Sequence, residues 1–174
     1  MIEVILQTKE ENMPSFDLVS KLAMGEVKNV LNMALKQIQG RYDFKGSETS
    51  LELKGETIEI VSEDETKLKA ALDILRSQMA KRGMAMKSME VEDPKPAGLK
   101  MLKQVLNLKF GIDKEAGKKI NKLVKESGAK VQSSYMDEKV RLTGKKIDDL
   151  QATYRMLKDH DDVKIDLQME NMKR

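Results

Sequence analysis

The residues best suited to chemistry lie in a short segment of the second half of the chain, Arg141-Leu142-Thr143-Gly144-Lys145-Lys146. Residue alternation before it predicts a strand and the pattern after it predicts a helix, so we expect a strand-to-helix corner. The first N–H groups of a helix lack partners within the helix and carry the positive end of its dipole. Lysines at such a corner suit a phosphate group. The competing interpretation is an ordinary turn whose charge is partly offset by Asp148 and Asp149, and the glycine spacing of a P-loop is absent.

A second candidate in the first half combines aromatic and cationic side chains, Gly40-Arg41-Tyr42-Asp43-Phe44-Lys45-Gly46. Arg41 and Tyr42 can clamp a base by stacking and cation–π contact, while Lys45 takes a phosphate. The alternative is structural: Tyr42 and Phe44 insert into the core below the preceding helix, and the two cations are solvated.

A third candidate is the open face of a sheet in the second half. Alternation places the following residues opposite the buried set: Lys103, Val105, Asn107, Lys109, Gln132, Ser134, Lys139, Arg141, Thr143, Lys164, Asp166 and Gln168. The matching face of the first half carries Glu52, Thr57, Glu59 and Val61. The second-half face has no aromatic residue, so it would neutralise phosphates rather than stack on bases. A solvated face, or one packed against the other domain, is an equally good interpretation.

Lysines also line one side of a predicted helix that follows Asp113, at Lys118, Lys119, Lys122 and Lys125. A solvated helix face is the simplest interpretation, and a stripe for an RNA backbone is the alternative.

Catalysis has little support in the sequence. The one histidine, His160, lies in Asp159-His160-Asp161-Asp162, which is typical of a solvated loop rather than a metal site. There is no recognisable pairing of nucleophile and base, and cysteine is absent, which excludes thiol chemistry and zinc–thiolate sites. We therefore expect a protein that is not an enzyme and needs no cofactor. A phosphohydrolase is the least favoured hypothesis.

Two similar halves must position these residues. Pro94 and Pro96 mark a linker over residues 94–98, between domains predicted at 13–93 and 99–174. Apolar positions repeat at an offset of 82 residues: Ile58 with Val140, Ile60 with Leu142, Leu68 with Leu150, Leu72 with Tyr154, and Leu75 with Leu157. Each half follows a βαββαβ order, which predicts an α+β fold of two ferredoxin-like domains. Gly40 is predicted to end the first helix, and a hairpin is predicted around Met136-Asp137-Glu138. The predicted helix starts are a capping box at 62–65 and an N-cap at Asp113, and the predicted final strand covers 163–169.

Charge is distributed unequally between these halves. From residue 99 onward there are 18 Lys and Arg against 12 Asp and Glu, a net of +6, and the remainder has 14 against 17, a net of −3. The second half is thus the better candidate for an anionic partner. No apolar stretch is long enough to cross a membrane, and the lack of cysteine is compatible with a reducing, cytoplasmic location.

Several segments closely resemble the bacterial YajQ family: Met13-Pro14-Ser15-Phe16-Asp17, Arg41 to Gly46, Lys81-Arg82-Gly83, Gly111-Ile112-Asp113, Val140 to Lys145, and Asp148-Asp149-Leu150-Gln151. The resemblance runs from Met13 to nearly the end of the chain. It implies two ferredoxin-like domains that exchange their N-terminal strands, so that Phe16 and Leu18 pack in the basic domain. Residues 1–12 precede the usual family opening, and Ile2, Val4 and Leu6 alternate like a strand.

The resemblance also implies nucleotide binding, since family members are described as binding nucleotides or tRNA, and some as cyclic di-GMP effectors acting with a transcription regulator. We expect a cytoplasmic protein that binds RNA, tRNA, ATP, GTP or cyclic di-GMP through basic residues of the second domain. The candidate contacts are Arg41, Tyr42, Phe44, Lys45, Lys109, Lys139, Arg141, Thr143, Gly144, Lys145 and Lys146. The alternative is an adaptor between proteins, or a partner of a transcription regulator, whose nucleotide binding is incidental.

Overall fold

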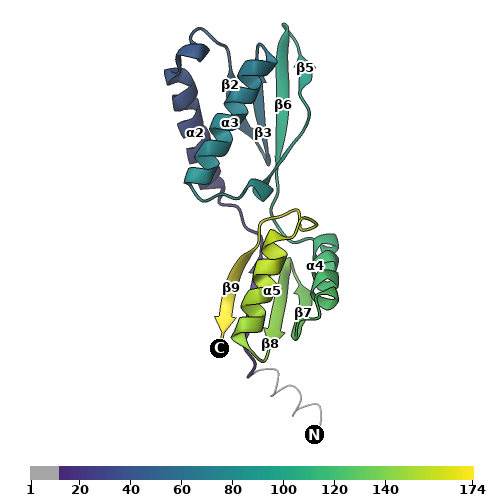
Figure 1. The fold of residues 1–174 in the computed structure, drawn as a ribbon. Coiled ribbons are helices and arrows are strands. Elements are labelled where there is room, and N and C mark those ends of the chain that lie inside the picture. The colour runs from purple at the N-terminus through teal and green to yellow at the C-terminus, as the bar shows by residue number, and fades with distance from the viewer. Residues whose placement is uncertain (1–11) are drawn as a thin grey trace. The chain divides into compact units, whose positions relative to one another are not determined.

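The computed structural model describes residues 12–174, and the chain forms two compact units (Figure 1). The central unit is Leu22–Lys109. The split unit joins residues from both ends of the chain, 12–21 and Phe110–Arg174. Within the described residues, no helix is long and apolar enough to cross a membrane. The predicted strand over Ile2, Val4 and Leu6 lies outside the described residues.

The central unit contains two long helices on one face of an antiparallel sheet. Its strand order is β2-β3-β6-β4, and β5 pairs with one end of β6. In chain order the elements are α2 (Met24–Gly40), β2 (Ser50–Lys54), β3 (Thr57–Ser62), α3 (Glu65–Lys81), β4 (Met89–Val91), β5 (Lys95–Ala97) and β6 (Met101–Leu108). Pro96 is thus part of a short edge strand, a position where a missing backbone N–H is tolerated.

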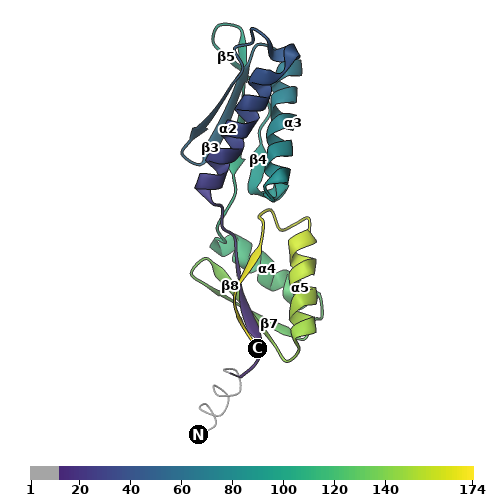
Figure 2. The same cartoon turned by 90° about the vertical axis from the view of Figure 1, so that its left-hand side faces the viewer.

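The split unit repeats this architecture with a strand from the beginning of the chain. Its sheet has the order β7-β8-β1-β9, and all of its pairings are antiparallel. The elements are β1 (Ser15–Val19), α4 (Lys114–Glu126), β7 (Val131–Met136), β8 (Lys139–Gly144), α5 (Ile147–Asp159) and β9 (Gln168–Lys173). In Figure 2 its two helices lie together on one face of the sheet.

These two antiparallel sheets with paired helices confirm the predicted α+β class and are consistent with two ferredoxin-like units. The repeat seen in the sequence is also visible in the element bounds. β3 begins at Thr57 and β8 at Lys139, while α3 begins at Glu65 and α5 at Ile147, so both pairs keep the offset of 82 residues.

Each unit has its own apolar core between its sheet and its helices. In the central unit, Ile58 and Ile60 from β3 pack with Leu68 and Leu75 from α3. In the split unit, Phe16 and Leu18 lie in one cluster with Val140, Leu142, Ile120 and Leu157. Phe16 also meets the ring of Tyr154 edge-on, with ring centroids 6.1 Å apart. The alternation of β1 therefore places its apolar side chains in the core of the split unit.

Side-chain caps fix two of the helix starts. The carboxylate of Asp113 accepts a hydrogen bond from the N–H of Ala116 at 2.8 Å, which confirms the predicted N-cap of α4. The predicted capping box at the start of α3 is wrong by two residues. Asp64 is the N-cap and accepts from the N–H of Lys67 at 2.8 Å, because Ser62 is still part of β3 and is completely buried.

The predicted final strand over residues 163–169 is displaced in the structure, where β9 covers Gln168–Lys173. Val163 and Leu167 are buried, as the alternation predicts, but Met169 at the end of the same alternation is 40% exposed. Val163 and Leu167 lie in the core ahead of the strand, and pairing with β1 begins only at Gln168, opposite Val19.

Gly117 in α4 lets the ring of Tyr135 pack directly against the backbone of the helix. A Cβ atom at this position would lie 2.5 Å from Cδ2 and 2.9 Å from Cγ of Tyr135, whose hydroxyl donates to the carbonyl of Ile112 at 2.9 Å. We expect Gly117→Ala to destabilise the split unit by about 1–3 kcal/mol, because overpacking outweighs the gain in helix propensity of about 1 kcal/mol.

Hydrogen exchange of the amides of β8 would measure the effect of Gly117→Ala. Gly25→Ala in α2 is a matched control, since nothing lies within 4 Å of the added Cβ. A Gly117→Ala protein in which β8 is protected as well as in the wild type would show that Tyr135 moves aside without cost.

Candidate functional site

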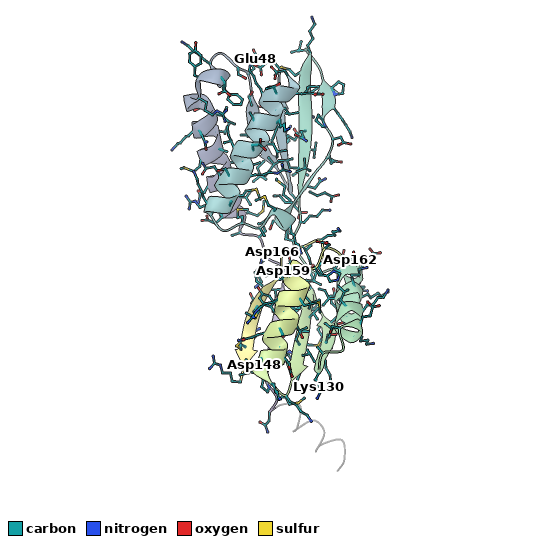
Figure 3. All side chains as sticks on the ribbon, in the orientation of Figure 1. Glu48, Lys130, Asp148, Asp159, Asp162 and Asp166 are labelled. Carbon is teal, nitrogen blue, oxygen red and sulfur yellow. The ribbon has the colours of Figure 1, made fainter. Side chains whose placement is uncertain are left out.

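A hollow of about 760 Å³ lies within the split unit, where α4 leads into β7 and β8 leads into α5. Clefts of several hundred Å³ are the usual size for small-molecule sites. Figure 3 labels Lys130 and Asp148 at this end of the unit. The lining residues come from the start of the described chain and from these two connections: Met13, Gly128, Ala129, Lys130, Val131, Gln132, Thr143, Gly144, Lys145, Lys146 and Asp149.

The lining of the hollow is cationic. Lys130, Lys145 and Lys146 are exposed, and none of them forms an ion pair with any residue between 12 and 174. One carboxylate, that of Asp149, also lines the hollow. Lys146 occupies the N-cap position of α5, and no side chain caps that helix. The N-terminal end of α5 therefore adds positive potential, which Asp148 and Asp149 in its first turn partly offset.

At Gly144 the end of β8 passes close to the backbone of neighbouring segments, and glycine is the residue that fits there. Gly144 ends β8, is buried, and donates its N–H to the carbonyl of Pro14 at 3.1 Å. A Cβ at this position would lie 3.3 Å from the carbonyl oxygen of Lys130, which is a tight contact with backbone. The lack of a side chain therefore lets the end of β8 approach the residue before β7, and it brings Lys130 next to the strand-to-helix corner.

Lys130 was not among the residues singled out from sequence, although a signal for it exists. β7 and β8 form an antiparallel hairpin in which Val131 is paired with Gly144. The residue before β7 must therefore lie beside the residues that follow β8. The hairpin prediction alone thus places Lys130 near Lys145.

Arg141 and Lys139 lie on the open face of the same sheet, where carboxylates neutralise them. Arg141 donates to Asp17 from two of its three guanidinium nitrogens, Nε to Oδ1 at 2.9 Å and an Nη to Oδ2 at 3.5 Å. The amide of Asn171 donates to Asp17 at 3.1 Å, and Lys139 lies 3.8 Å from Glu170. Arg141 and Lys139 are therefore paired with carboxylates of their own sheet, unlike the lysines of the hollow.

Asp17 is only 4% exposed and sits between β8 and β9. Its burial raises the pKa of the carboxyl group, but hydrogen bonds from Arg141 and Asn171 and the charges of Arg141 and Lys139 outweigh this effect. The net result is a pKa below the ordinary value of 3.8. Asp17 is thus ionised at neutral pH and anchors the open face of the sheet.

Lys109 lies apart from the other basic candidates, in the central unit. Because β6 pairs with β3 and β4, Lys103, Val105, Asn107 and Lys109 share a face with the acidic residues of the first half. Lys109 lies 2.8 Å from Glu90, and Lys103 lies 3.7 Å from Glu59. The single basic face expected for the second half is therefore divided between two sheets, and the part on β6 is paired with carboxylates.

The segment from Arg41 to Gly46 is also in the central unit. Phe44 is 5% exposed and belongs to the core, which leaves its ring unavailable for stacking. Tyr42 is 89% exposed, so the interpretation that it inserts into the core is wrong. Arg41 pairs with Asp43 at 2.8 Å and lies 5.6 Å from the centroid of the Phe44 ring, while Lys45 is exposed.

The loop after Phe44 is fixed by the carboxylate of Glu63. It accepts hydrogen bonds from the hydroxyls of Ser47 at 2.8 Å and Ser62 at 3.1 Å, and from the N–H of Glu48 at 3.3 Å. Burial raises the pKa of Glu63, but these bonds, together with one from its own N–H, dominate and hold the pKa at about 2. Tyr42 is thus exposed beside an anchored loop.

The described residues contain no group of three or more histidine, cysteine, aspartate or glutamate side chains that could hold a metal ion. The expected loop around His160 follows α5, and its Asp162 pairs with Lys119 at 3.6 Å.

Comparison with known proteins gives a match over nearly the whole chain. The model of the family described as "Nucleotide-binding protein YajQ-like" matches residues 14–173. A protein of Geotalea daltonii named "Nucleotide-binding protein" is 45% identical over 161 residues, which cover 92% of this chain and 99% of that protein. Proteins of the same name from Hydrogenovibrio crunogenus and Desulfitobacterium hafniense are 44% and 45% identical, over 92% and 90% of this chain and 99% and 96% of their own lengths. These names include no enzymatic activity.

Proposed function

Because the chain belongs to the YajQ-like family, we propose that it is a nucleotide-binding protein that is not an enzyme and that holds ligand phosphates in the hollow of the split unit. The observation that carries this proposal is the set of three lysines around the hollow, Lys130, Lys145 and Lys146, none of them paired with a carboxylate of the described chain. Unpaired ammonium groups that converge on a concave surface favour an anion over solvent.

The rest of the lining suits the other parts of a nucleotide. Gln132 and Thr143 provide hydrogen-bonding groups for a sugar or base edge, and Met13 and Val131 provide apolar surface for a base. A hollow of about 760 Å³ accommodates a mononucleotide such as ATP or GTP, a compact cyclic dinucleotide such as cyclic di-GMP, or one nucleotide of an RNA or tRNA strand.

Removing the three lysines tests the proposal. We expect Lys130→Ser/Lys145→Ser/Lys146→Ser to weaken binding of GTP, ATP or cyclic di-GMP by at least about tenfold, since the loss of even one charged hydrogen bond of about 1.5 kcal/mol reduces affinity by that factor. Isothermal titration at two salt concentrations measures the effect. Arg141 stays unchanged in this design, because it neutralises the buried Asp17.

The matched control removes three exposed lysines from the central unit, Lys28→Ser/Lys36→Ser/Lys69→Ser, which changes the net charge equally. Equal affinity in the hollow variant and the wild type, with both proteins folded, would refute the hollow as the site. Equal losses in both variants would show that only the net charge matters.

A second candidate function is an adaptor that contacts another protein, such as a transcription regulator. Tyr42 favours it, because a tyrosine 89% exposed beside an anchored loop is the kind of side chain that dominates protein interfaces. Salt separates the two functions: phosphate binding weakens steeply as salt rises, whereas an interface built on an aromatic residue is much less sensitive.

We also propose that the first strands of the two ferredoxin-like units are exchanged. Two observations support this. β1 precedes α2 in the chain but pairs with β8 and β9, and β6 precedes α4 but pairs with β3 and β4. One inner strand of each sheet therefore comes from the other sequence repeat: β1 in the split unit and β6 in the central unit.

A further inference from the structure

Helix α4 carries a stripe of lysines along its solvent side. Lys114, Lys118, Lys122 and Lys125 are exposed and follow one another at spacings of four, four and three residues, so they project from one side of the helix. The opposite side, with Ile120, Leu123 and Val124, is buried in the core of the split unit. We call these four residues the α4 lysine stripe.

The stripe is unfavourable for the helix itself. Like charges at spacings of three or four residues repel, and Lys114 in the first turn lies at the positive end of the helix dipole, whereas only Lys125 in the last turn is placed where the dipole favours a cation. Only one stripe member has a carboxylate partner among residues 12–174, the exposed contact of Lys122 with Glu126 at 3.8 Å. Residues that destabilise their own helix in this way are expected mainly at functional surfaces.

The stripe leads toward the hollow. The last stripe residue, Lys125, is followed closely by Gly128, the first residue of α4's connection to β7 that lines the hollow, and Lys130 comes next. Both features belong to the same compact unit, and α4 packs beside β7 (Figure 2). Lysines therefore continue along the chain from the start of α4, through Lys125, to Lys130 at the hollow.

We infer that the α4 lysine stripe binds the phosphate backbone of a nucleic-acid strand whose terminal or looped nucleotide occupies the hollow. This inference rests on the function proposed above and adds the surface along which the backbone of a polynucleotide ligand would lie. An anionic membrane is disfavoured because the apolar side of α4 is buried and cannot enter a bilayer. A protein partner is disfavoured because lysine is depleted at protein interfaces, and the stripe contains no aromatic residue.

The test uses a fluorescent single-stranded oligouridylate of about twelve nucleotides, with binding followed by anisotropy over a range of salt concentrations. In Lys114→Gln/Lys118→Gln/Lys122→Gln/Lys125→Gln we expect affinity for this RNA to fall at least tenfold at low salt. The slope of log K against log salt should become shallower by about 0.7 for each lysine that contacts a phosphate. Binding of GTP in the hollow should stay within twofold of the wild type.

The matched control is Lys28→Gln/Lys36→Gln/Lys69→Gln/Lys81→Gln, four exposed helical lysines of the central unit with no ion pair to residues 12–174. Hydrogen exchange of the α4 amides in the stripe variant checks that this helix remains folded. The inference is overturned if the control loses as much RNA affinity as the stripe variant, if the stripe variant loses none, or if polyglutamate competes as well as RNA does. The proposed function is tested separately by Lys130→Ser/Lys145→Ser/Lys146→Ser. If this variant loses GTP binding while the stripe variant keeps its RNA affinity, the proposed function is supported and the stripe inference is refuted.

Discussion

Replacing Arg141 by serine will lower the free energy of unfolding of the split unit by about 3 kcal/mol at pH 7, because the change leaves a buried carboxylate without its main partner. Asp17 is 4% exposed, and Arg141 supplies two of its hydrogen bonds. Asn171 would remain as a donor at 3.1 Å, which limits the loss. Urea denaturation, with hydrogen exchange of β8 amides as a local probe, measures the change.

The pH dependence of this loss identifies its cause. In the wild type the pKa of Asp17 is lowered, so its stabilising contribution is present above pH 3.8, its ordinary pKa, and disappears as pH falls through the lower pKa of the folded state. In Arg141→Ser, burial is left as the main influence and favours the protonated acid. The difference in stability between the two proteins should therefore shrink below about pH 4.

A double variant is the control for the buried charge. In Asp17→Asn/Arg141→Ser no carboxylate is left uncompensated, so this protein should recover much of the lost stability at pH 7. If Arg141→Ser alone is as stable as the wild type, or the double variant is no better than the single one, Asp17 does not depend on Arg141 for its charge.

Cutting the chain between Asp93 and Pro94 will leave the two fragments tightly associated. An inserted protease site at this position divides the protein into a first fragment with β1, α2, β2, β3, α3 and β4 and a second with β5, β6, α4, β7, β8, α5 and β9. β1 is paired with β8 and β9 of the second fragment, and β6 is paired with β3 and β4 of the first. Each sheet would lose an inner strand if the fragments separated.

Size-exclusion chromatography after cleavage measures this association. We expect both fragments to elute together at the volume of the intact chain, and to separate only in denaturant, when both lose their secondary structure. A protein with the same site inserted but left uncleaved controls for the insertion. Two fragments that elute separately, each folded, would contradict the exchange of first strands.

Local features of the fold were predictable from the sequence where a pattern and its partner lie close together. Gly40 ends α2, Asp113 caps α4, and the offset of 82 residues relates β3 to β8. The hairpin around Met136-Asp137-Glu138 follows from two alternating segments and a short connection, which is formed in the structure with positive φ angles at Asp137 and Glu138.

The environment of Lys109 was not predictable from residue alternation. Alternation shows which side of a strand is buried, but it does not show which sheet the strand enters. Lys109 lies beside Glu90 because β6 pairs with β4. The ion-pair partner of Arg141 was not predictable for a similar reason, since Asp17 lies 124 residues away in the sequence and reaches Arg141 only through the pairing of β1 with β8.

Backbone amide chemical shifts during titration with GTP or cyclic di-GMP test the central claim most directly. Ligand phosphates held by the hollow should shift the amides of Gly144, Lys145, Lys146 and Lys130 first and most strongly, and Lys130→Ser/Lys145→Ser/Lys146→Ser should remove these shifts. Shifts that concentrate around Tyr42, with the amides of the hollow unchanged at saturation, would show that the cationic hollow is not where this protein binds nucleotides.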